Sequence, residues 1–496
     1  MVKITVRSEK GKKELFAQPG ESVLEALRKS GIYVPANCGG LGTCRKCKVR
    51  INGKTILACG EKIAGDLEVE LLAKDAAGLE ASFGRIYEVL ESEGFGIALD
   101  LGTTTVAAYL LDLRSGREID RTSGQNRQIS FGADVITRIK KASEGALTNL
   151  QKTIVLQINE MIAGFRKKNN FPGIKRMVIA GNTTMLHILA KADPSPLGVA
   201  PYRARFLDRK IFKGEVLGLD AEEVVLLPAV SAFIGGDIVS GLLACDVYRR
   251  DENILFCDFG TNGEIILKTK AGIFGTSTAA GPAFEGARID CGMAGITGAA
   301  AKIEAEAGEL KIHTIGDGEL KGICGSGLVD LIYLLLKEGV IDETGAFVPE
   351  SSSPLAGRLW GDKFHLSEDV YLSQRDIREF QLAKSAIASG IRILIDESGL
   401  GADEIDIACL AGGFGFYINK ENAIGLGLLP ESLKEKTLSV GNSSGLGAKM
   451  ALTNPAHLEE CDLLARSVQV VELANNQKFS EHFMDNMLLK EMGDGS

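Results

Sequence analysis

Residues 96–113 read GIALDLGTTTVAAYLLDL, which is an apolar run, a Gly/Thr turn and a second apolar run. Short continuous apolar segments bounded by glycine are typical of buried strands, so this stretch predicts two strands joined by a tight turn. Residues 253–267, NILFCDFGTNGEIIL, have the same arrangement. With helical patterns between and after them, the two units predict an α/β protein with two similar halves that face each other.

Each of these two units carries an aspartate near the end of its first strand, Asp100 and Asp258. The turn that follows offers backbone N–H groups and small hydroxyl side chains to an anion. Two aspartates facing each other across a cleft would hold Mg²⁺, directly or through water, beside bound phosphates. The pair therefore predicts a nucleotide site whose phosphate-contacting residues are Gly102, Thr103, Thr104, Gly260, Thr261 and Asn262.

A late glycine segment extends this site. Gly412, Gly413 and Phe414 follow the apolar strand DIACL, and a Gly-Gly turn can lie flat against an adenine or a ribose. Asn442 comes shortly afterwards and is expected to close the same wall. Two phosphate turns followed by a Gly-Gly turn predict that the nucleotide lies between the two halves.

Three further stretches each allow a functional and a purely structural interpretation. Gly181 and Asn182 end a strand, where they either line the cleft or cap a helix. Glu285 either reaches a nucleotide hydroxyl or base, or is a solvated acid at a helix start. Asp237 either orients the attacking water or belongs to a helix N-terminus. The sequence leaves all three pairs open.

Length, charge and the N-terminus limit the classes of function. The chain has 496 residues, enough for about three units, and a formal net charge of −9 that disfavours a nucleic-acid partner. It has no run of eighteen uncharged apolar residues and no apolar core of a signal peptide near its start. We therefore expect a cytoplasmic protein with no membrane span.

Four of the ten cysteines fall within 22 residues, at Cys38, Cys44, Cys47 and Cys59. The surrounding strands, a short helix and the segment KVRINGKTI, which predicts a hairpin with Asn52-Gly53 at its tip, indicate a small α+β unit. A glycine-rich loop can deliver three thiolates, and the fourth ligand, Cys59, comes from the strand after the hairpin; four thiolates that converge in this way suit an iron–sulfur cluster. Structural zinc is the alternative, but zinc ribbons usually bring two C-x2-C pairs together, and only one pair here has that spacing.

The CGGLGTCRKC segment in this setting resembles the 2Fe–2S ferredoxin domain, a β-grasp fold, although the fourth cysteine follows sooner than is usual. The order of the two phosphate turns and the Gly-Gly turn resembles the actin/Hsp70/sugar-kinase superfamily, an α/β actin-like (ribonuclease H-like) two-lobed ATPase fold. These resemblances imply a ferredoxin-like domain at 1–75, a linker at 76–94, a first lobe at 95–250 and a second lobe with a C-terminal return segment at 251–496.

Most of the chain is similar to one family, the ATP-dependent reductive activators of corrinoid enzymes. The resemblance is carried by stretches such as IAGNTTMLHIL, STAAGPAFEGARIDCGMAGITGA and AGGFGFYINKENAIGLGLLP. It implies that a 2Fe–2S centre, driven by ATP and Mg²⁺, passes one electron to cob(II)alamin in a corrinoid protein or a corrinoid-dependent methyltransferase. It also implies an upstream electron donor and a homodimer.

Two departures from that family are visible. The linker is only some twenty residues, where relatives carry an extra segment, and CGMAGITGA lacks an arginine that relatives often have after the methionine. A redox-sensing ATPase regulator, or an activator of another metalloenzyme such as a 2-hydroxyacyl-CoA dehydratase, is the alternative function. A small-molecule kinase would need a substrate-specific base that the sequence does not reveal.

Overall fold

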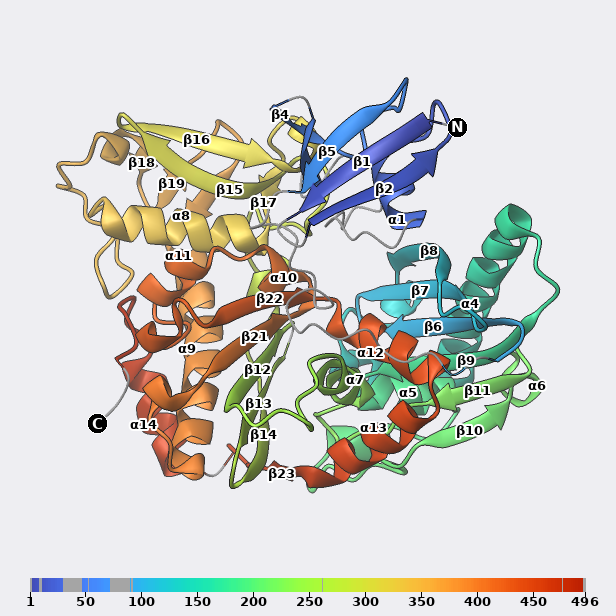
Figure 1. Cartoon of the computed structure of the whole chain (residues 1–496). Helices are drawn as coiled ribbons and strands as arrows, with labels where there is room; N and C mark the ends of the chain where they lie inside the picture. Colours follow the sequence, from blue (N-terminus) through green and yellow to red (C-terminus); the bar gives the residue numbers. More distant parts are fainter. Residues whose placement is uncertain are drawn as a thin grey trace.

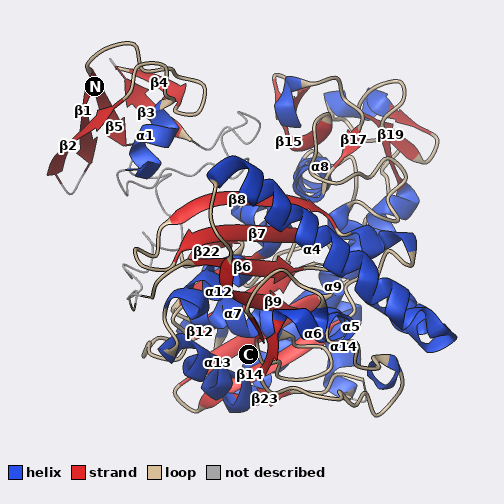
Figure 2. Cartoon of the chain, turned by 90° about the vertical axis from the view of Figure 1, so that its right-hand side faces the viewer, coloured by secondary structure: helices blue, strands red, loops and turns tan. Residues whose placement is uncertain are grey.

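The computed structural model shows a small N-terminal domain beside a two-lobed body (Figure 1). Each lobe is built on one six-stranded sheet, and helices cover both faces of each sheet (Figure 2). The residues that the structure describes are 2–8, 11–29, 47–51, 53–71, 90, 92–260, 262–474 and 476–493. Most of the linker expected at 76–94 lies outside them.

The N-terminal domain is a five-stranded sheet in the order β2-β1-β5-β3-β4, covered by one helix. Its central pair, β1 and β5, is parallel, and the other pairs are antiparallel. Val23 and Leu27 of the helix pack against sheet residues such as Val69. The expected strands, helix and hairpin are confirmed. Their bounds are β1 Val2–Ser8, β2 Gly11–Ala17, α1 Val23–Lys29, β3 Lys48–Ile51, β4 Lys54–Leu57 and β5 Leu67–Leu71.

The first lobe has the sheet order β10-β11-β9-β6-β7-β8. The long helix α4 lies along the outer face of this sheet (Figure 2). The strands are β6 Phe95–Leu101, β7 Thr105–Asp112, β8 Glu118–Gln125, β9 Ile174–Gly181, β10 Lys210–Lys213 and β11 Glu223–Leu226. The helices are α3 Val135–Lys141, α4 Leu147–Asn169, α5 Thr183–Leu189, α6 Gly214–Leu217 and α7 Gly236–Ala244.

The second lobe has the sheet order β22-β21-β12-β13-β14-β23 and carries two small three-stranded sheets. The strands of the main sheet are β12 Ile254–Phe259, β13 Gly263–Thr269, β14 Gly272–Thr278, β21 Ile407–Ala411, β22 Thr437–Gly441 and β23 Val468–Val470. The small sheets contain β15 Ala299–Glu306, β16 Glu309–Thr314, β17 Gly322–Ile323, β18 Leu359–Trp360, β19 Lys363–His365 and β20 Tyr371–Ser373. The helices are α8 Gly325–Lys337, α9 Gln374–Ser398, α10 Gly412–Tyr417, α11 Lys420–Gly425, α12 Ser443–Thr453, α13 Ala456–Ser467 and α14 Gln477–Asp485.

The two lobes repeat one strand pattern, as the duplicated sequence unit predicts. In the first lobe β6, β7 and β8 form an antiparallel meander, and β9 lies parallel to β6 on its other side. In the second lobe β12, β13 and β14 form the same meander, and β21 lies parallel to β12. The turn between β6 and β7 (the first turn) and the turn between β12 and β13 (the second turn) therefore occupy equivalent places in the two sheets.

Helices α7 and α12 fill the space between the two sheets. Their apolar side chains share one core with Ala98 and Val178 of the first sheet and with Phe256 and Cys409 of the second. The two helices approach closely, because a Cβ on Gly447 would lie 1.9 Å from the carbonyl oxygen of Ser240. A helix from the C-terminal part of the chain is thus built into the first lobe.

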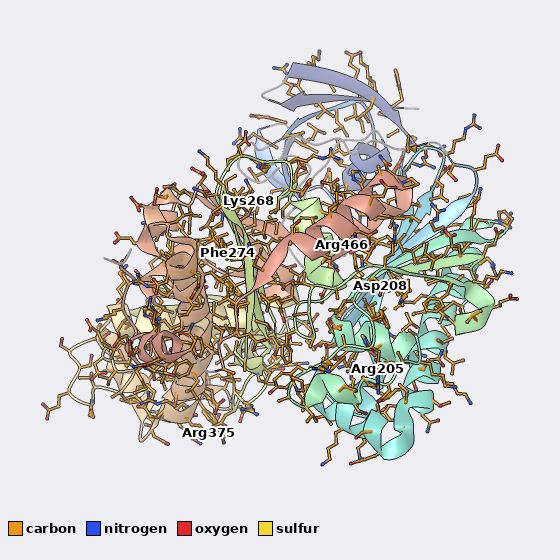
Figure 3. All side chains as sticks on the ribbon, turned by 90° about the horizontal axis from the view of Figure 1, so that it is seen from below. Arg205, Asp208, Lys268, Phe274, Arg375 and Arg466 are labelled. Carbon is orange, nitrogen blue, oxygen red and sulfur yellow. The ribbon has the colours of Figure 1, made fainter. Side chains whose placement is uncertain are left out.

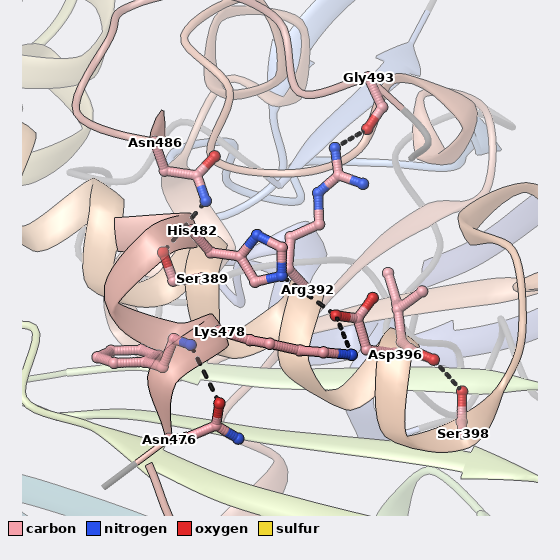
Figure 4. Close-up of polar contacts among 11 residues, drawn as sticks. Ser389, Arg392, Asp396, Ser398, Asn476, Lys478, His482, Asn486 and Gly493 are labelled. Carbon is pink, nitrogen blue, oxygen red and sulfur yellow. Dashed lines mark hydrogen bonds and ion pairs between the residues drawn. The ribbon is translucent and has the colours of Figure 1, made fainter. Parts of the chain in front are cut away.

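The last segment of the chain packs onto α9. Asn486 donates to Ser389 Oγ at 3.1 Å, and His482 and Lys478 both contact Asp396 (Figure 4). Helix α13 makes a second link, where Asp462 pairs at 3.1 Å with Arg209 of the first lobe. Arg466 of α13 also lies near Asp208 of the first lobe (Figure 3). In the described chain, every helix is either too short or too polar to cross a lipid bilayer.

Candidate functional site

The first turn joins β6 to β7 and begins just after Asp100. Gly102 donates its N–H to Thr105 O at 3.0 Å, and a Cβ on Gly102 would lie 2.6 Å from that same oxygen. Only glycine therefore fits this position. The N–H groups of Thr103 and Thr104 have no hydrogen-bond partner among the described residues. Two adjacent unpaired backbone donors are a suitable site for an anion.

The second turn, between β12 and β13, also begins with a glycine whose N–H donates to a carbonyl oxygen of the turn, but over two residues instead of three. Gly260 donates its N–H to Asn262 O at 2.9 Å, and Thr261 itself lies outside the described residues. The Gly-Gly segment begins beside this turn, because Ala411 pairs with Asp258 across the sheet. Gly412 has a φ of +75°, and a Cβ there would lie 2.4 Å from Asp258 Oδ1.

Several carboxylates near these two turns have raised pKa values. Burial and then the charge of Asp100 raise the pKa of Asp237 to about 7. Burial, followed by the charges of Asp237 and Asp100, raises the pKa of Asp258 to about 7. Burial, followed by the charges of Asp237 and Asp258, also raises the pKa of Glu264. This arrangement favours a cation, since carboxylates held close together repel each other until a proton or a metal ion neutralises them.

No three acidic, histidine or cysteine side chains in the described part of the chain lie close enough to hold a metal ion by themselves. A cation at this site would thus take part of its coordination from water or from phosphate oxygens, which is the usual way in which Mg²⁺ binds. The cluster of carboxylates fits Mg²⁺ bound together with a nucleotide.

Asp100 is held by residues from the far end of the sequence. Asn442 Nδ2 donates to Asp100 Oδ2 at 2.9 Å, and Ser444 Oγ donates to Oδ1 at 2.8 Å. Burial raises the pKa of Asp100, and these two hydrogen bonds act against the rise. Because Gly441 pairs with Ala411, Asn442 also lies next to the Gly-Gly segment, so it links that segment to the first turn.

Asn182 and Asp237, for which the sequence left a structural and a functional interpretation open, show features of both in the structure. Asn182 caps α5 by accepting from Met185 N, and its Nδ2 also donates to Thr103 Oγ1 at 2.9 Å. Asp237 lies in the first turn of α7, where Oδ1 accepts from Ile238 N at 2.9 Å, and it also faces Asp100. Both residues therefore combine a helix-terminal role with a place in the cleft.

Glu285 lies beside the second turn. The structure has a single 3-10 turn, Pro282–Glu285, where the sequence suggested the start of a helix, because Gly286 in a left-handed conformation ends it. A Cβ on Gly260 would lie 3.5 Å from Glu285 Oε1. The carboxylate therefore faces the phosphate-side turn.

The aromatic residue of the Gly-Gly segment packs on other rings. Phe414 stacks on Phe284 with a centroid distance of 4.4 Å and an interplanar angle of 20°. Gly413, its neighbour, is exposed, and a Cβ there would meet nothing within 4 Å. The segment thus offers an open glycine backed by apolar rings, which suits the flat face of an adenosine.

Sequence reasoning missed Glu264 and Arg138. Glu264 had a visible signal, since it is a carboxylate at the start of the apolar strand GEIIL. Arg138 had none, because it is one of three basic residues in VITRIKK and only the fold buries it. Its guanidinium donates to Thr103 O at 2.8 Å, directly behind the first turn.

The cluster domain places two of its four cysteines in one region. Cys47 is buried at the start of β3, and Cys59 follows β4 and packs against the same core. The N–H of Ala58 donates to Cys47 O at 2.7 Å, so the two cysteine-bearing segments are adjacent. Cys38 and Cys44 lie outside the described residues.

This fold and site define the chain as a two-lobed ATPase of the actin/Hsp70/sugar-kinase class fused to a ferredoxin-type domain. Residues 7–77 match the 2Fe–2S iron–sulfur cluster binding domain. Residues 95–250 match the middle region of RACo, and residues 252–495 match its C-terminal ASKHA domain. The predicted fold class is confirmed.

Whole-chain comparisons point to one family. The chain is 35% identical over 418 residues to a corrinoid activation enzyme, RamQ, of Eubacterium limosum, covering 79% of this chain and 70% of the relative. It is 25% identical to a Co(II) methylated amine-specific corrinoid protein reductase of Methanosarcina barkeri, covering 79% of this chain and 76% of that protein. A solved reductive activator for a corrinoid, iron–sulfur protein superposes with a TM-score of 0.74 at 27% identity over 99% of both chains. This protein belongs to the family of RACo-type reductive activators of corrinoid proteins.

Proposed function

We propose that this protein uses ATP to return a corrinoid protein from the Co(II) to the Co(I) state by transferring one electron from its 2Fe–2S cluster. The observation that carries the proposal is the similarity to a corrinoid activator over 99% of the chain, cluster domain and ATPase together. Neither part alone would distinguish this activity, since ferredoxin domains and ATPases of this class serve many functions.

Each group of residues has a distinct task in this proposal. Cys38, Cys44, Cys47 and Cys59 hold the cluster, which supplies a one-electron carrier when bound. The unpaired N–H groups of the first turn hold phosphate oxygens.

The carboxylates complete the nucleotide site. Asp100 and Asp258 would hold Mg²⁺, directly or through water, and the cation would neutralise the repulsion among the acids. Asp237 keeps one oxygen on Ile238 N and uses the other to orient the attacking water.

The hydrogen bonds to Asp100 supply the link between nucleotide and lobe position. Asn442 lies between β22, a strand of the second lobe's sheet, and α12, and Ser444 lies in the first turn of α12; both contact an aspartate at the end of β6 in the first lobe. Binding or hydrolysis of Mg-ATP changes the charge at Asp100 and therefore biases these contacts. Closure of the two lobes is the type of motion by which such a site does conformational work on a partner.

The partners follow from the chemistry. The electron acceptor is a corrinoid protein or a corrinoid-dependent methyltransferase, and a separate donor must reduce the cluster after each transfer. The relatives named above act on corrinoid proteins, which supports this assignment. We further propose a cytoplasmic homodimer, because cluster assembly needs reduced thiols and the family resemblance implies a dimer.

The decisive experiment mixes the cluster-loaded protein, a chemical reductant, Mg-ATP and a corrinoid protein in the Co(II) state. The visible spectrum should show Co(I) formation that depends on ATP. ATP hydrolysis without any Co(I), together with a hydrolysis rate that changes with the oxidation state of the cluster, would instead support a redox-sensing ATPase. Zinc in place of iron and sulfide in the purified protein would contradict the assignment of the N-terminal domain.

A further inference from the structure

Arg138 lies beneath the first phosphate turn and is completely buried, with 0% of its surface exposed. It belongs to α3, which Asp134 caps by accepting from Thr137 N at 2.7 Å. The guanidinium donates through Nη2 to Thr103 O at 2.8 Å and through Nε to Gly132 O at 2.9 Å. The longer contacts are to Gln128 Oε1 at 3.4 Å and Met185 Sδ at 3.2 Å.

None of these contacts is a carboxylate, and Arg138 makes no ion pair with any described residue. Burial lowers the pKa of Arg138 to about 10, so the side chain is still charged at neutral pH. A buried charge without a counter-ion is costly in free energy, and proteins keep one where a partner of opposite charge arrives. The atoms that the guanidinium contacts directly are neutral oxygens and a thioether sulfur, and the charge of Asp134 offsets part of the effect of burial without forming an ion pair.

The peptide groups of the first turn are polarised by the charge of Arg138. The carbonyl oxygens of Gly102, Thr103 and Thr104 accept, in order, from Asn126 Nδ2 at 2.9 Å, from Arg138, and from Asn126 N at 2.8 Å. In a trans peptide the C=O and the N–H point in opposite directions, so the N–H groups of Thr103 and Thr104 are directed away from these donors. A cation on the carbonyl side polarises the same peptide units and strengthens the N–H groups as donors.

We propose that Arg138 is a positioning residue for the triphosphate. It fixes the turn through Thr103 O and supplies, from behind, the positive charge that the phosphates need while the carboxylates of the cleft take Mg²⁺. This inference rests on the proposed function only in requiring that ATP binds at the two turns. It predicts that the contribution of Arg138 to affinity grows with the number of phosphates on the nucleotide.

The test compares Arg138→Met, Arg138→Lys and a matched control. Lys268 is the control, since its ammonium is also buried and donates to two backbone carbonyl oxygens, those of Arg250 and Glu252 (Figure 3). Lys268 lies on β13, which begins at Gly263 at the end of the second turn, and it is five residues further along that strand. Dissociation constants for Mg-ATP, Mg-ADP and adenosine are measured by titration calorimetry on the full cluster-loaded protein, together with the Tm rise that each ligand causes.

Arg138→Met should weaken Mg-ATP binding by about tenfold or more, Mg-ADP less, and adenosine not at all, because the lost charge acts on phosphates. Arg138→Lys keeps the positive charge but not the planar guanidinium, so its affinity for Mg-ATP should lie between those of wild type and Arg138→Met. Lys268→Met should lower the Tm of the free protein and leave all three affinities unchanged.

Equal losses for ATP, ADP and adenosine in Arg138→Met would overturn the proposal and make Arg138 a structural residue. So would an unchanged ATP affinity in both Arg138 variants. If Arg138→Met does not fold, Arg138→Lys provides the test. A lower ratio of ATP affinity to adenosine affinity than in wild type supports the proposal, and an unchanged ratio overturns it. Wild-type protein that binds no ATP would instead refute the proposed function, so the two failures are distinguishable.

Discussion

Single residues of the cleft are held in an electrostatically unfavourable arrangement. The pKa of Asp237 and that of Asp258 are both raised to about 7, first by burial and then by neighbouring carboxylates. Free aspartates in an unfolded chain titrate near about 3.9. The folded protein without ligand therefore binds more protons than the unfolded chain at these sites between the two values, which favours unfolding as the pH rises.

This difference predicts the pH dependence of stability. The free energy of unfolding of the ligand-free protein should fall at these sites as the pH rises from about 4 to about 7. Asp258→Asn removes one of the charges, so the Tm of the variant should change less than that of wild type over this window. Mg-ATP should raise the wild-type Tm more at about pH 8 than at about pH 6, because protons compete with the cation.

Thermal melts at several pH values check this prediction. Asp208→Asn is the control, because Asp208 is exposed and a hydrogen bond from Lys210 lowers its pKa, the opposite direction. An unchanged pH profile in Asp258→Asn would show that Asp258 does not share charge repulsion with Asp237.

A second prediction concerns the cluster ligands. Cys47→Ser or Cys59→Ser should reduce the iron and sulfide content and the visible absorbance, because a hydroxyl replaces a thiolate ligand. Folding of the ATPase and its nucleotide affinity should remain. Cys291→Ser, at a half-buried cysteine of the second lobe, is the matched control and should keep the cluster. Full iron and sulfide content in both ligand variants would refute the assignment.

At the scale of elements, the turn that precedes α10 depends on one glycine. Gly412 combines a φ of +75° with an approach that leaves no room for a Cβ beside Asp258. Gly399, which ends α9, has a similar φ of +71° and open space around it. The two positions therefore separate backbone strain from the steric contact with the carboxylate.

Gly412→Ala and Gly399→Ala should each lose about 1–2 kcal/mol of stability, because alanine is disfavoured in the left-handed region. Only Gly412→Ala should also lose ATP hydrolysis, since its methyl group displaces Asp258. Chemical denaturation and a phosphate-release assay measure the two effects. ATP hydrolysis at the wild-type rate in Gly412→Ala would mean that Asp258 tolerates displacement.

At the scale of the whole molecule, charge is divided unevenly between the cluster domain and the rest of the chain. Residues 1–75 contain 14 Lys and Arg against 9 Asp and Glu, a net charge of +5. The remaining residues contain 42 against 56, a net charge of −14. The cluster domain is thus the basic part of an acidic protein, and long-range attraction would bring it toward acidic surfaces.

We expect the second-order rate of electron transfer to a corrinoid protein to fall as the ionic strength rises, because salt screens this attraction. Stopped-flow measurements at several salt concentrations check the prediction. The rate at saturating partner should be less sensitive to salt, which serves as the internal control. A second-order rate that rises with salt would indicate repulsion, and hence a basic partner surface.

Much of the architecture was predictable because its signals are local. The strand patterns around Asp100 and Asp258, the glycine turns and the spacing from Cys38 to Cys59 lie within short windows of sequence. The strand–turn–strand units and the hairpin at Gly53 were predicted correctly for this reason. The extent of the helix expected near Glu285 was wrong, because a left-handed Gly286 ends it after one 3-10 turn.

The sequence by itself determined the class of fold and the two strand–turn–strand units, since each depends on residues that are neighbours in the chain. Only the tertiary structure showed that Asn442 and Ser444 hold Asp100 across more than three hundred residues. It likewise singled out Arg138 from the basic residues of α3 by burying its charge behind Thr103. The contacts of Asn442 and Ser444 arise when the two sheets pack around α7 and α12, and that of Arg138 arises when α3 packs behind the first turn; no local pattern records which distant side chains such packing brings together.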